Sequence, residues 1–408
     1  MVNVLRPFMV RCHRVIGLAT ALFLFVAGAT GAIISWDHEL DEWLNPQLFE
    51  TAIPDNSEPG QRLFTALELA NRYEQQQSAA QVTWLDLHQE PGHNTLLYVE
   101  GAADPVSGQQ QRLPHNQIAM NPYTGTAQSW RHWGDISLSR ENLLPFLYKL
   151  HYSLHLPDGL GLELGILFMG VVAVFWTLDC LIALGISFPS RRVWRKSFRF
   201  RWRQPGHKLT FDLHRSGGVW IWPLLLIVAF SSISMNLEYQ LVRPLLGQIS
   251  SLTPDAFDTR PARPMNKPAS PQLTREQILA IATDEARRLG WKKPPGGLYY
   301  GALHKVYGVG FYTLEGAHGD GGLGPNWLQI DSDNGDILAR IETGKGTAAD
   351  IFVQAQYPLH SGRILGLTGR ILLSLLGVIV AILSLTGILI WLKRTRLTSP
   401  RRAQPDRP

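Results

Sequence analysis

Four long apolar stretches decide what this chain can fold into. They occupy residues 15–36, 160–186, 217–235 and 371–392. Each is close to the roughly 20 residues that a helix needs to cross about 30 Å of hydrocarbon. The first stretch is longer than the apolar part of a secretion signal, and it runs into WDHELDE without a cleavage pattern. We therefore expect four transmembrane helices, the first of which stays in the protein as an anchor.

The positions of Lys and Arg predict the orientation of these helices. The loop between the second and third stretches carries eight of them before its first acid, Asp212. Loops rich in Lys and Arg stay on the cytoplasmic side. The N-terminus and the tail have the same bias, so we expect both termini in the cytoplasm and two large segments on the far side. Because no base-reading motif accompanies the net charge of +5, we expect membrane lipid and no nucleic acid as a partner.

The two far-side segments repeat one order of elements. In the second, LTREQILAIATDEARRLG has apolar residues at helical spacing and Thr274 as its expected N-cap, and strand-like segments follow it. In the first, GQRLFTALELANRYEQ predicts a helix that strands also follow. The sequence therefore predicts an α+β membrane protein, a four-transmembrane-helix bundle with two α+β domains. The expected parts are 1–36 (N-terminus and first helix), 37–150 (first domain), 151–187 (second helix), 188–213 (basic loop), 214–236 (third helix), 237–362 (second domain with a Pro-rich linker), 363–392 (fourth helix) and 393–408 (basic tail).

A histidine precedes each apolar stretch. Alternating crossings place His13 and His214 at the cytoplasmic interface, and His151, His155 and His360 at the opposite one. Two neutral imidazoles from neighbouring helices are the ligand set of a bis-histidine haem, and a four-helix bundle has a core in which the macrocycle fits. We therefore expect two haem groups, one near each face, that form a transmembrane electron path. No C-x-x-C motif is present, so the expected cofactor is non-covalently bound haem b.

The surroundings of these histidines leave several alternatives. His151 and His155 are spaced i, i+4 on one helix face, so either can reach an iron, and we favour His151. A zinc site at this H-x-x-x-H needs further ligands, and no acid stands at a standard spacing. The positive end of a helix favours the neutral imidazole that a ligand at a helix start requires. Arg14, Arg215 and Arg363 follow their histidines closely and are candidates for binding haem propionates, with snorkelling to lipid headgroups as the competing explanation.

Two further features lie within the apolar stretches. Glu163 and Asp179 belong to the second stretch, where an ionisable group is costly and marks a candidate proton or quinol contact. AGATGAIISW near the end of the first stretch resembles LSLTGILIW near the end of the fourth. Small residues at such positions predict close contact between helices.

Four segments resemble the signature segments of the PepSY-associated transmembrane helix family: HRVIGLATALFLFVAGATG, LHYSLHLPDGLG, LHRSGGVW and LHSGRILGLTGRILLSLLG. The helix-and-strand segments are similar to PepSY domains, so the resemblance covers almost the whole chain. It implies a multi-pass protein of the bacterial inner membrane with two periplasmic PepSY-like domains. It also implies that His13 and His214 hold a haem iron on the cytoplasmic side, and that His151 and His360 hold another on the periplasmic side.

The resemblance further implies a haem-dependent oxidoreductase that reduces the iron of ferric siderophores. Because hard oxygen donors such as hydroxamates hold Fe(III) far better than Fe(II), one electron is enough to release the metal. Nothing in the chain resembles a flavin or NADPH module, so the expected electron donor is a quinol or a cytoplasmic reductase. Trp130 and Trp133 in SWRHWGD are candidates for a platform under the chelate, or for domain core or an aromatic belt. Two other functions stay open: a non-enzymatic PepSY-type binding or regulatory membrane protein, and a siderophore permease.

Overall fold

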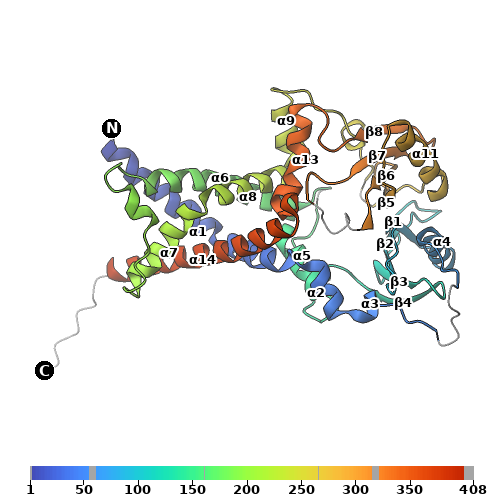
Figure 1. The fold of residues 1–408 in the computed structure, drawn as a ribbon, viewed down its shortest axis with the longest axis horizontal. Coiled ribbons are helices and arrows are strands. Elements are labelled where there is room, and N and C mark those ends of the chain that lie inside the picture. Colours follow the sequence, from blue (N-terminus) through green and yellow to red (C-terminus); the bar gives the residue numbers. More distant parts are fainter. Residues whose placement is uncertain (1, 55–60, 160, 265, 315–320, 399–408) are drawn as a thin grey trace.

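A helical bundle and a β-sheet make up the two ends of the molecule (Figure 1). The computed structural model describes residues 2–54, 61–159, 161–264, 266–314 and 321–398. Residue 160 of the second apolar stretch and residues 399–408 of the expected basic tail lie outside the described residues. The N-terminal helix begins, and the C-terminal helix ends, at the end of the bundle away from the sheet. We call this the loop end, after the loop of residues 188–206 that lies there, and we call the opposite end of the bundle the sheet end.

Within the described residues, three unbroken helices are long and apolar enough to cross a membrane. They are α1 (Val2–Ile34), α6 (Leu164–Ser187) and α14 (Gly366–Thr398). Helices α1 and α14 approach closely at Gly28, where a Cβ would lie 2.6 Å from the carbonyl oxygen of Gly377. The close contact expected from the small residues of AGATG is therefore present at Gly28.

The third apolar stretch is bent instead of forming one straight helix. Helices α7 (His207–Trp220) and α8 (Trp222–Asn236) meet at an angle of 72°. Pro223 stands in the first turn of α8, where its ring and missing N–H interrupt the helical hydrogen bonds to the preceding turn. The expected single helix over 214–236 is thus corrected to a pair. In the part of the chain that the structure describes, the candidate spans number three, or four if the bent pair counts as one span.

Two short helices lie where the bundle meets the sheet. Helix α5 (Leu143–Ser153) ends in the left-handed region at Leu154, and α13 (Ala348–Ser361) ends in it at Gly362. A Cβ on Gly362 would collide with the carbonyl group of Gly369, so this tight turn into α14 requires glycine. Because these breaks separate α5 from α6 and α13 from α14, each short helix is free to take its own direction.

The sheet is a single antiparallel sheet of eight strands in the order β4-β3-β2-β1-β5-β6-β7-β8. The two halves of the chain join where Trp84, Leu85 and Asp86 of β1 pair with Tyr299, Leu298 and Gly297 of β5. The strands are β1 (Ala80–Asp86), β2 (Thr95–Gly101), β3 (Gln117–Asn121), β4 (Thr126–Arg131), β5 (Pro295–Gly301), β6 (Val306–Phe311), β7 (Asn326–Asp331) and β8 (Ile337–Ile341). The expected repeat is therefore present as one helix and four strands in each half.

One helix of each half covers the face of the sheet that points away from the bundle (Figure 1). Helix α4 (Ala66–Gln76) buries Leu69 against the first four strands, and α11 (Arg275–Arg288) buries Ile278 against the last four. The predicted N-cap Thr274 is confirmed, because its hydroxyl accepts a hydrogen bond from the backbone N–H of Gln277. The remaining short elements are α2 (Asp37–Leu44), α3 (Pro46–Phe49), η1 (Trp194–Phe198), η2 (Glu238–Val242), α9 (Arg243–Leu246), α10 (Ala256–Thr259) and η3 (Arg363–Leu365).

Candidate haem-binding site

Four of the five predicted histidines meet in two pairs inside the bundle. His13 of α1 faces His214 of α7, with ring centres 6.0 Å apart and ring planes inclined by 45°. His151 of α5 faces His360 of α13, with ring centres 6.2 Å apart and planes inclined by 59°. We call these the loop-end pair and the sheet-end pair. Residues separated by about 200 positions in the chain thus come together in each pair.

The separation of the rings fits one metal ion between each pair. A metal–imidazole bond is about 2 Å long and the nitrogen lies about 1 Å from the ring centre, so two rings on opposite sides of one iron have centres about 6 Å apart. Both observed distances agree with this value. The inclination of the planes is compatible as well, since each ring can rotate about its own bond to the metal.

Two imidazoles are fixed by backbone carbonyl groups of neighbouring helices. The bonds run from His151 Nδ1 to Ala27 O and from His214 Nδ1 to Leu383 O, each 3.0 Å long. A hydrogen bond at Nδ1 selects the tautomer whose other nitrogen, Nε2, is free to bind a metal. Each carbonyl lies four residues before a glycine, Gly31 or Gly387. A Cβ on these glycines would come within 3.0 and 3.1 Å of the imidazole Cε1, so their small size admits the ring.

The Thr-Gly pair is the shared element of AGATGAIISW and LSLTGILIW. Thr30 Oγ1 lies 3.1 Å from His151 Nδ1, and Thr386 Oγ1 lies 3.3 Å from His214 Nδ1. Close helix contact was the expected role of this likeness. In the structure, the repeated Thr-Gly instead forms the seat of an imidazole on α1 and again on α14.

The other two imidazoles have side-chain partners at Nδ1. His360 Nδ1 lies 3.1 Å from the hydroxyl of Ser231 on α8. His13 Nδ1 donates to the carboxylate of Asp179 on α6 at 2.8 Å. Asp179 was expected as a proton or quinol contact, and its place in the structure is beside an imidazole. Glu163 precedes the first residue of α6 and is exposed.

His155 lies apart from the sheet-end pair. Its ring stacks on Phe146 at 4.7 Å between centres, and its Nε2 lies 2.9 Å from the Phe146 carbonyl oxygen. The i, i+4 argument fails because α5 ends at Ser153 and both Leu154 and His155 have positive φ. His151 and His155 therefore point in different directions, which also removes the geometry that a zinc site would need. Among the described residues, no cluster of three or more His, Cys, Asp or Glu is suited to a metal ion.

The helix-start argument for neutral imidazoles is wrong. His151 and His360 lie in the last turns of α5 and α13, while His13 and His214 lie inside α1 and α7. The positive ends of these helices are therefore distant from the rings. The Nδ1 acceptors described above, and not the helix dipole, orient the imidazoles.

The three predicted arginines have different surroundings. Arg14 is exposed on α1. Arg215 donates to the Lys196 carbonyl and lies over the ring of Phe211, while its buried Nε atom has no partner among the described residues. Arg363 lies over the ring of Tyr357 and lines a cavity next to the sheet-end pair. Arg215 and Arg363 thus contact groups other than the paired imidazoles, although they follow His214 and His360 by one and three residues.

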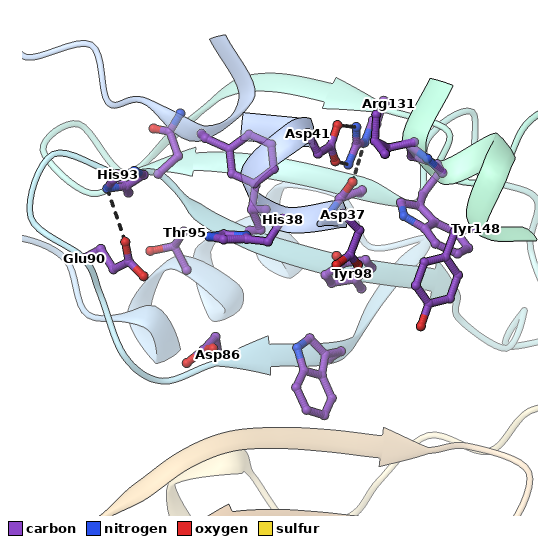
Figure 2. Close-up of a pocket in the computed structure, with 18 of the residues that line it drawn as sticks. Asp37, His38, Asp41, Asp86, Glu90, His93, Thr95, Tyr98, Arg131 and Tyr148 are labelled. Carbon is purple, nitrogen blue, oxygen red and sulfur yellow. Dashed lines mark hydrogen bonds and ion pairs between the residues drawn. The ribbon is translucent and has the colours of Figure 1, made fainter. Parts of the chain in front are cut away.

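A cavity of about 610 Å³ opens between the sheet and the sheet end of the bundle. Figure 2 shows side chains that line this cavity: Tyr148 of α5, Tyr98 of β2, and Asp37, His38 and Asp41 of α2. Trp133 also lines it, with its ring 5.8 Å from that of Tyr148, and Tyr148 lies three residues before His151. Trp130 does not belong to this lining: it is 52% exposed on β4 and packs against His115. Of the two predicted tryptophans, Trp133 thus lines the cavity, together with Tyr148, and Trp130 does not.

Acidic side chains outnumber basic ones around the cavity. The carboxylates are Asp37, Asp41, Asp86 and Glu90, and the guanidinium groups are Arg131 and Arg363. Arg131 is neutralised by Asp41 through two hydrogen bonds of 2.9 and 2.5 Å (Figure 2). Burial raises the pKa of Asp37, and the nearby charge of Arg363 partly opposes this rise. The lining also holds three histidines, His38, His88 and His93. With these imidazoles neutral, the four carboxylates exceed the two guanidinium groups, and the cavity favours a neutral or positively charged ligand with apolar faces.

Comparison with known proteins places the chain in a family. No curated protein matches it. The PepSY-associated TM region family matches residues 10–394, which include both histidine pairs and the whole sheet. The resemblance identified from the signature segments is thereby confirmed at the level of the family. This chain belongs to the PepSY-associated TM region family.

Proposed function

We propose that this PepSY-family membrane protein is a di-haem b oxidoreductase that passes electrons across the bacterial inner membrane and reduces ferric siderophore iron in the periplasm. The observation that carries the proposal is the pairing of four imidazoles at 6.0 and 6.2 Å, one pair at each end of the bundle. The sheet end faces the periplasm in this proposal, and both termini lie in the cytoplasm. The positive charge of the loop between α6 and α7 supports this orientation.

The residues at the two pairs fit haem groups that are held without a covalent bond to the chain. Bound haem supplies a one-electron carrier whose potential depends on its ligands and their hydrogen bonds. His13 and His214 would hold one group, and His151 and His360 the other. The Nδ1 acceptors keep all four rings in the tautomer that binds metal through Nε2. Arg215 and Arg363 would bind the propionates as charged donors.

The spacing of the two pairs suits a relay across the membrane. His13 and Ala27 both lie on α1, and Ala27 holds the imidazole of His151. Ala27 follows His13 by fourteen positions, which corresponds to about 21 Å along the helix axis at 1.5 Å per residue. This is most of the roughly 30 Å thickness of the hydrocarbon core. Electrons from a quinol or a cytoplasmic reductase would therefore cross in one step between the pairs.

The cavity beside the sheet-end pair supplies a docking place for the substrate. Its aromatic side chains, Trp133 and Tyr148, offer faces for the apolar body of a chelate, and its excess of carboxylates disfavours anionic ligands. Ferric hydroxamate chelates are neutral or cationic and meet both conditions. Each Fe(III) takes up one electron, and the hydroxamate oxygens then hold the Fe(II) only weakly. The segments of this chain resemble those of the ferrioxamine reductase FoxB, which agrees with this substrate class.

Anaerobic reoxidation of the purified protein tests the proposal. The protein in detergent is reduced with dithionite, freed of excess reductant and mixed with a ferric trihydroxamate. We expect the reduced α-band to disappear and Fe(II) to appear with a chromogenic chelator, one iron for each electron lost. The control is the gallium chelate, which has the same shape and no accessible reduced state. A protein without haem bands would leave a non-enzymatic binding role, and chelate uptake into proteoliposomes without reductant would favour a permease.

A further inference from the structure

The four paired imidazoles differ in what accepts the hydrogen at Nδ1. His151 and His214 donate to carbonyl oxygens, and His360 lies beside the hydroxyl of Ser231. His13 is the only one of the four that is bonded to a carboxylate, that of Asp179. The loop-end pair therefore has a carboxylate at the Nδ1 of one ligand, whereas the Nδ1 partners at the sheet-end pair are uncharged groups.

The setting of Asp179 makes this contact energetically significant. The residue lies in the middle of α6, next to Cys180 in the apolar core of the bundle, and is only 9% exposed. A buried carboxylate without a partner is strongly destabilising. The Nδ1–H of His13, at 2.8 Å, is the partner that the structure provides. The carboxylate is thus held against the imidazole.

We propose that Asp179 is a positioning residue that lowers the reduction potential of the haem at the loop-end pair below that of the haem at the sheet-end pair. The inference rests on the proposed function. A carboxylate that accepts from Nδ1–H makes the imidazole a stronger electron donor through Nε2, which stabilises Fe(III) relative to Fe(II). Its negative charge acts in the same direction. With Asp179 in this place, electron transfer from a haem at the loop-end pair to a haem at the sheet-end pair would be energetically favourable.

The arginines at the two ends do not cancel this difference. Arg215 stands one residue after His214, and Arg363 stands three residues after His360. Each guanidinium also has one carboxylate nearby, Asp212 for Arg215 and Asp37 for Arg363, so the two ends are alike in this respect. Of the carboxylates in the described ranges, none is hydrogen-bonded to His151 or His360, whose Nδ1 partners are given above. The asymmetry therefore depends on Asp179.

A redox titration of the haem bands tests the inference. In the native protein we expect two midpoint potentials, of which His13→Ala removes the lower and His360→Ala the higher. Asp179→Asn keeps the shape and one acceptor oxygen but removes the charge. We expect this variant to raise the reduction equilibrium constant of the lower-potential haem by on the order of tenfold, which corresponds to about 59 mV for one electron. The higher potential should not change.

The control is Cys180→Ser, which changes the neighbouring buried residue of α6 without touching His13, and we expect neither potential to shift. If Asp179→Asn fails to bind haem, the assignment through His13→Ala and His360→Ala still decides the order of the potentials. Loss of the higher potential in His13→Ala, or an unchanged lower potential in haem-loaded Asp179→Asn, overturns the inference. A native protein with no haem bands contradicts the proposed function instead.

Discussion

Gly31 of α1 lies directly against the imidazole of His151, because a Cβ at this position would come within 3.0 Å of the ring Cε1. The same relationship holds between Gly387 of α14 and His214, at 3.1 Å. These glycines are not flexible points in the helices. Because glycine has no side chain, an imidazole from another helix packs directly against each of these two long helices. The ring Nδ1 can then reach the carbonyl group one turn earlier.

Replacement of either glycine is therefore expected to displace one imidazole. In Gly31→Val the branched side chain overlaps the His151 ring, and we expect loss of the sheet-end haem while the loop-end haem remains. Gly387→Val is expected to do the reverse. Haem content and redox titration of each purified variant measure the effect. Gly218→Ala on α7 is the control, because a Cβ there would be in ordinary contact, 3.9 Å from Leu383. Full haem content in Gly31→Val would contradict the seating of His151.

The two tryptophans of SWRHWGD are expected to differ in their effect on substrate binding. Trp133 lines the cavity with Tyr148, whereas Trp130 lies outside it and is half exposed. We expect Trp133→Ala to raise KM for a ferric trihydroxamate by on the order of tenfold, since the loss of aromatic contact and buried area is worth about 1 kcal/mol or more. Trp130→Ala is expected to leave KM unchanged. Equal effects of the two variants would argue against chelate binding in this cavity.

The cavity charge predicts a second dependence on the substrate. Asp37 lies in α2 near Arg363, and its neutral replacement removes a carboxylate from the lining. We expect Asp37→Asn to raise KM for a cationic chelate more than for a neutral one of the same size. Kinetics with two trihydroxamates that differ by one ammonium group measure the ratio. A ratio that stays constant would show that Asp37 does not face the substrate.

The buried pair of Arg131 and Asp41 is expected to be costly to break on one side only. Arg131 on β4 donates hydrogen bonds to Asp41 on α2, and their side chains are 3% and 11% exposed, respectively. Removal of the Arg131 guanidinium group would therefore leave the Asp41 carboxylate buried without its charged partner. We expect Arg131→Met to lower stability by about 3–5 kcal/mol. The double variant Arg131→Met with Asp41→Leu should recover much of this. Thermal unfolding in detergent compares the two, and a double variant as unstable as the single one would contradict the argument.

His93 gives the sheet end a specific pH dependence. The hydrogen bond from His93 Nε2 to Glu42, 2.9 Å long, raises the pKa of His93 above its usual value of 6.5. The folded state therefore binds the proton more tightly than the unfolded state. The resulting stabilisation is complete below pH 6.5 and is lost as the pH rises through the higher pKa of the folded state. In the native protein, we expect the melting temperature to fall as the pH rises through this range, and this fall should be absent in Glu42→Gln. A native melting temperature that rises with pH would refute the assignment.

Sequence patterns predicted the elements that depend on local features. Apolar length identifies α1, α6 and α14, and the Thr274 cap begins α11 as expected. The order of charges and crossings also predicted which histidines share an end of the bundle. These features are visible because each depends on neighbouring residues or on a simple alternation.

Other features depend on contacts that are distant in the chain. The junction of β1 with β5 brings Trp84 beside Tyr299, and the contact of His13 with Asp179 spans 166 positions. Pro223 is a local indication of the bend at Ile221, but the length of the apolar stretch alone predicted one straight helix. His155 was placed on the face of His151 because the left-handed end of α5 has no glycine to mark it. The repeated Thr-Gly was the one local signal of an imidazole seat.

The number of haem groups per chain tests the central claim most directly. Pyridine haemochrome analysis of the purified protein is expected to give two haem groups per chain, falling to one in His13→Ala, to one in His360→Ala and to none in the double variant. His155→Ala, whose ring lies outside both pairs, should retain both. A native protein that purifies without haem, and takes up none on reconstitution, would contradict the assignment of these four imidazoles as iron ligands.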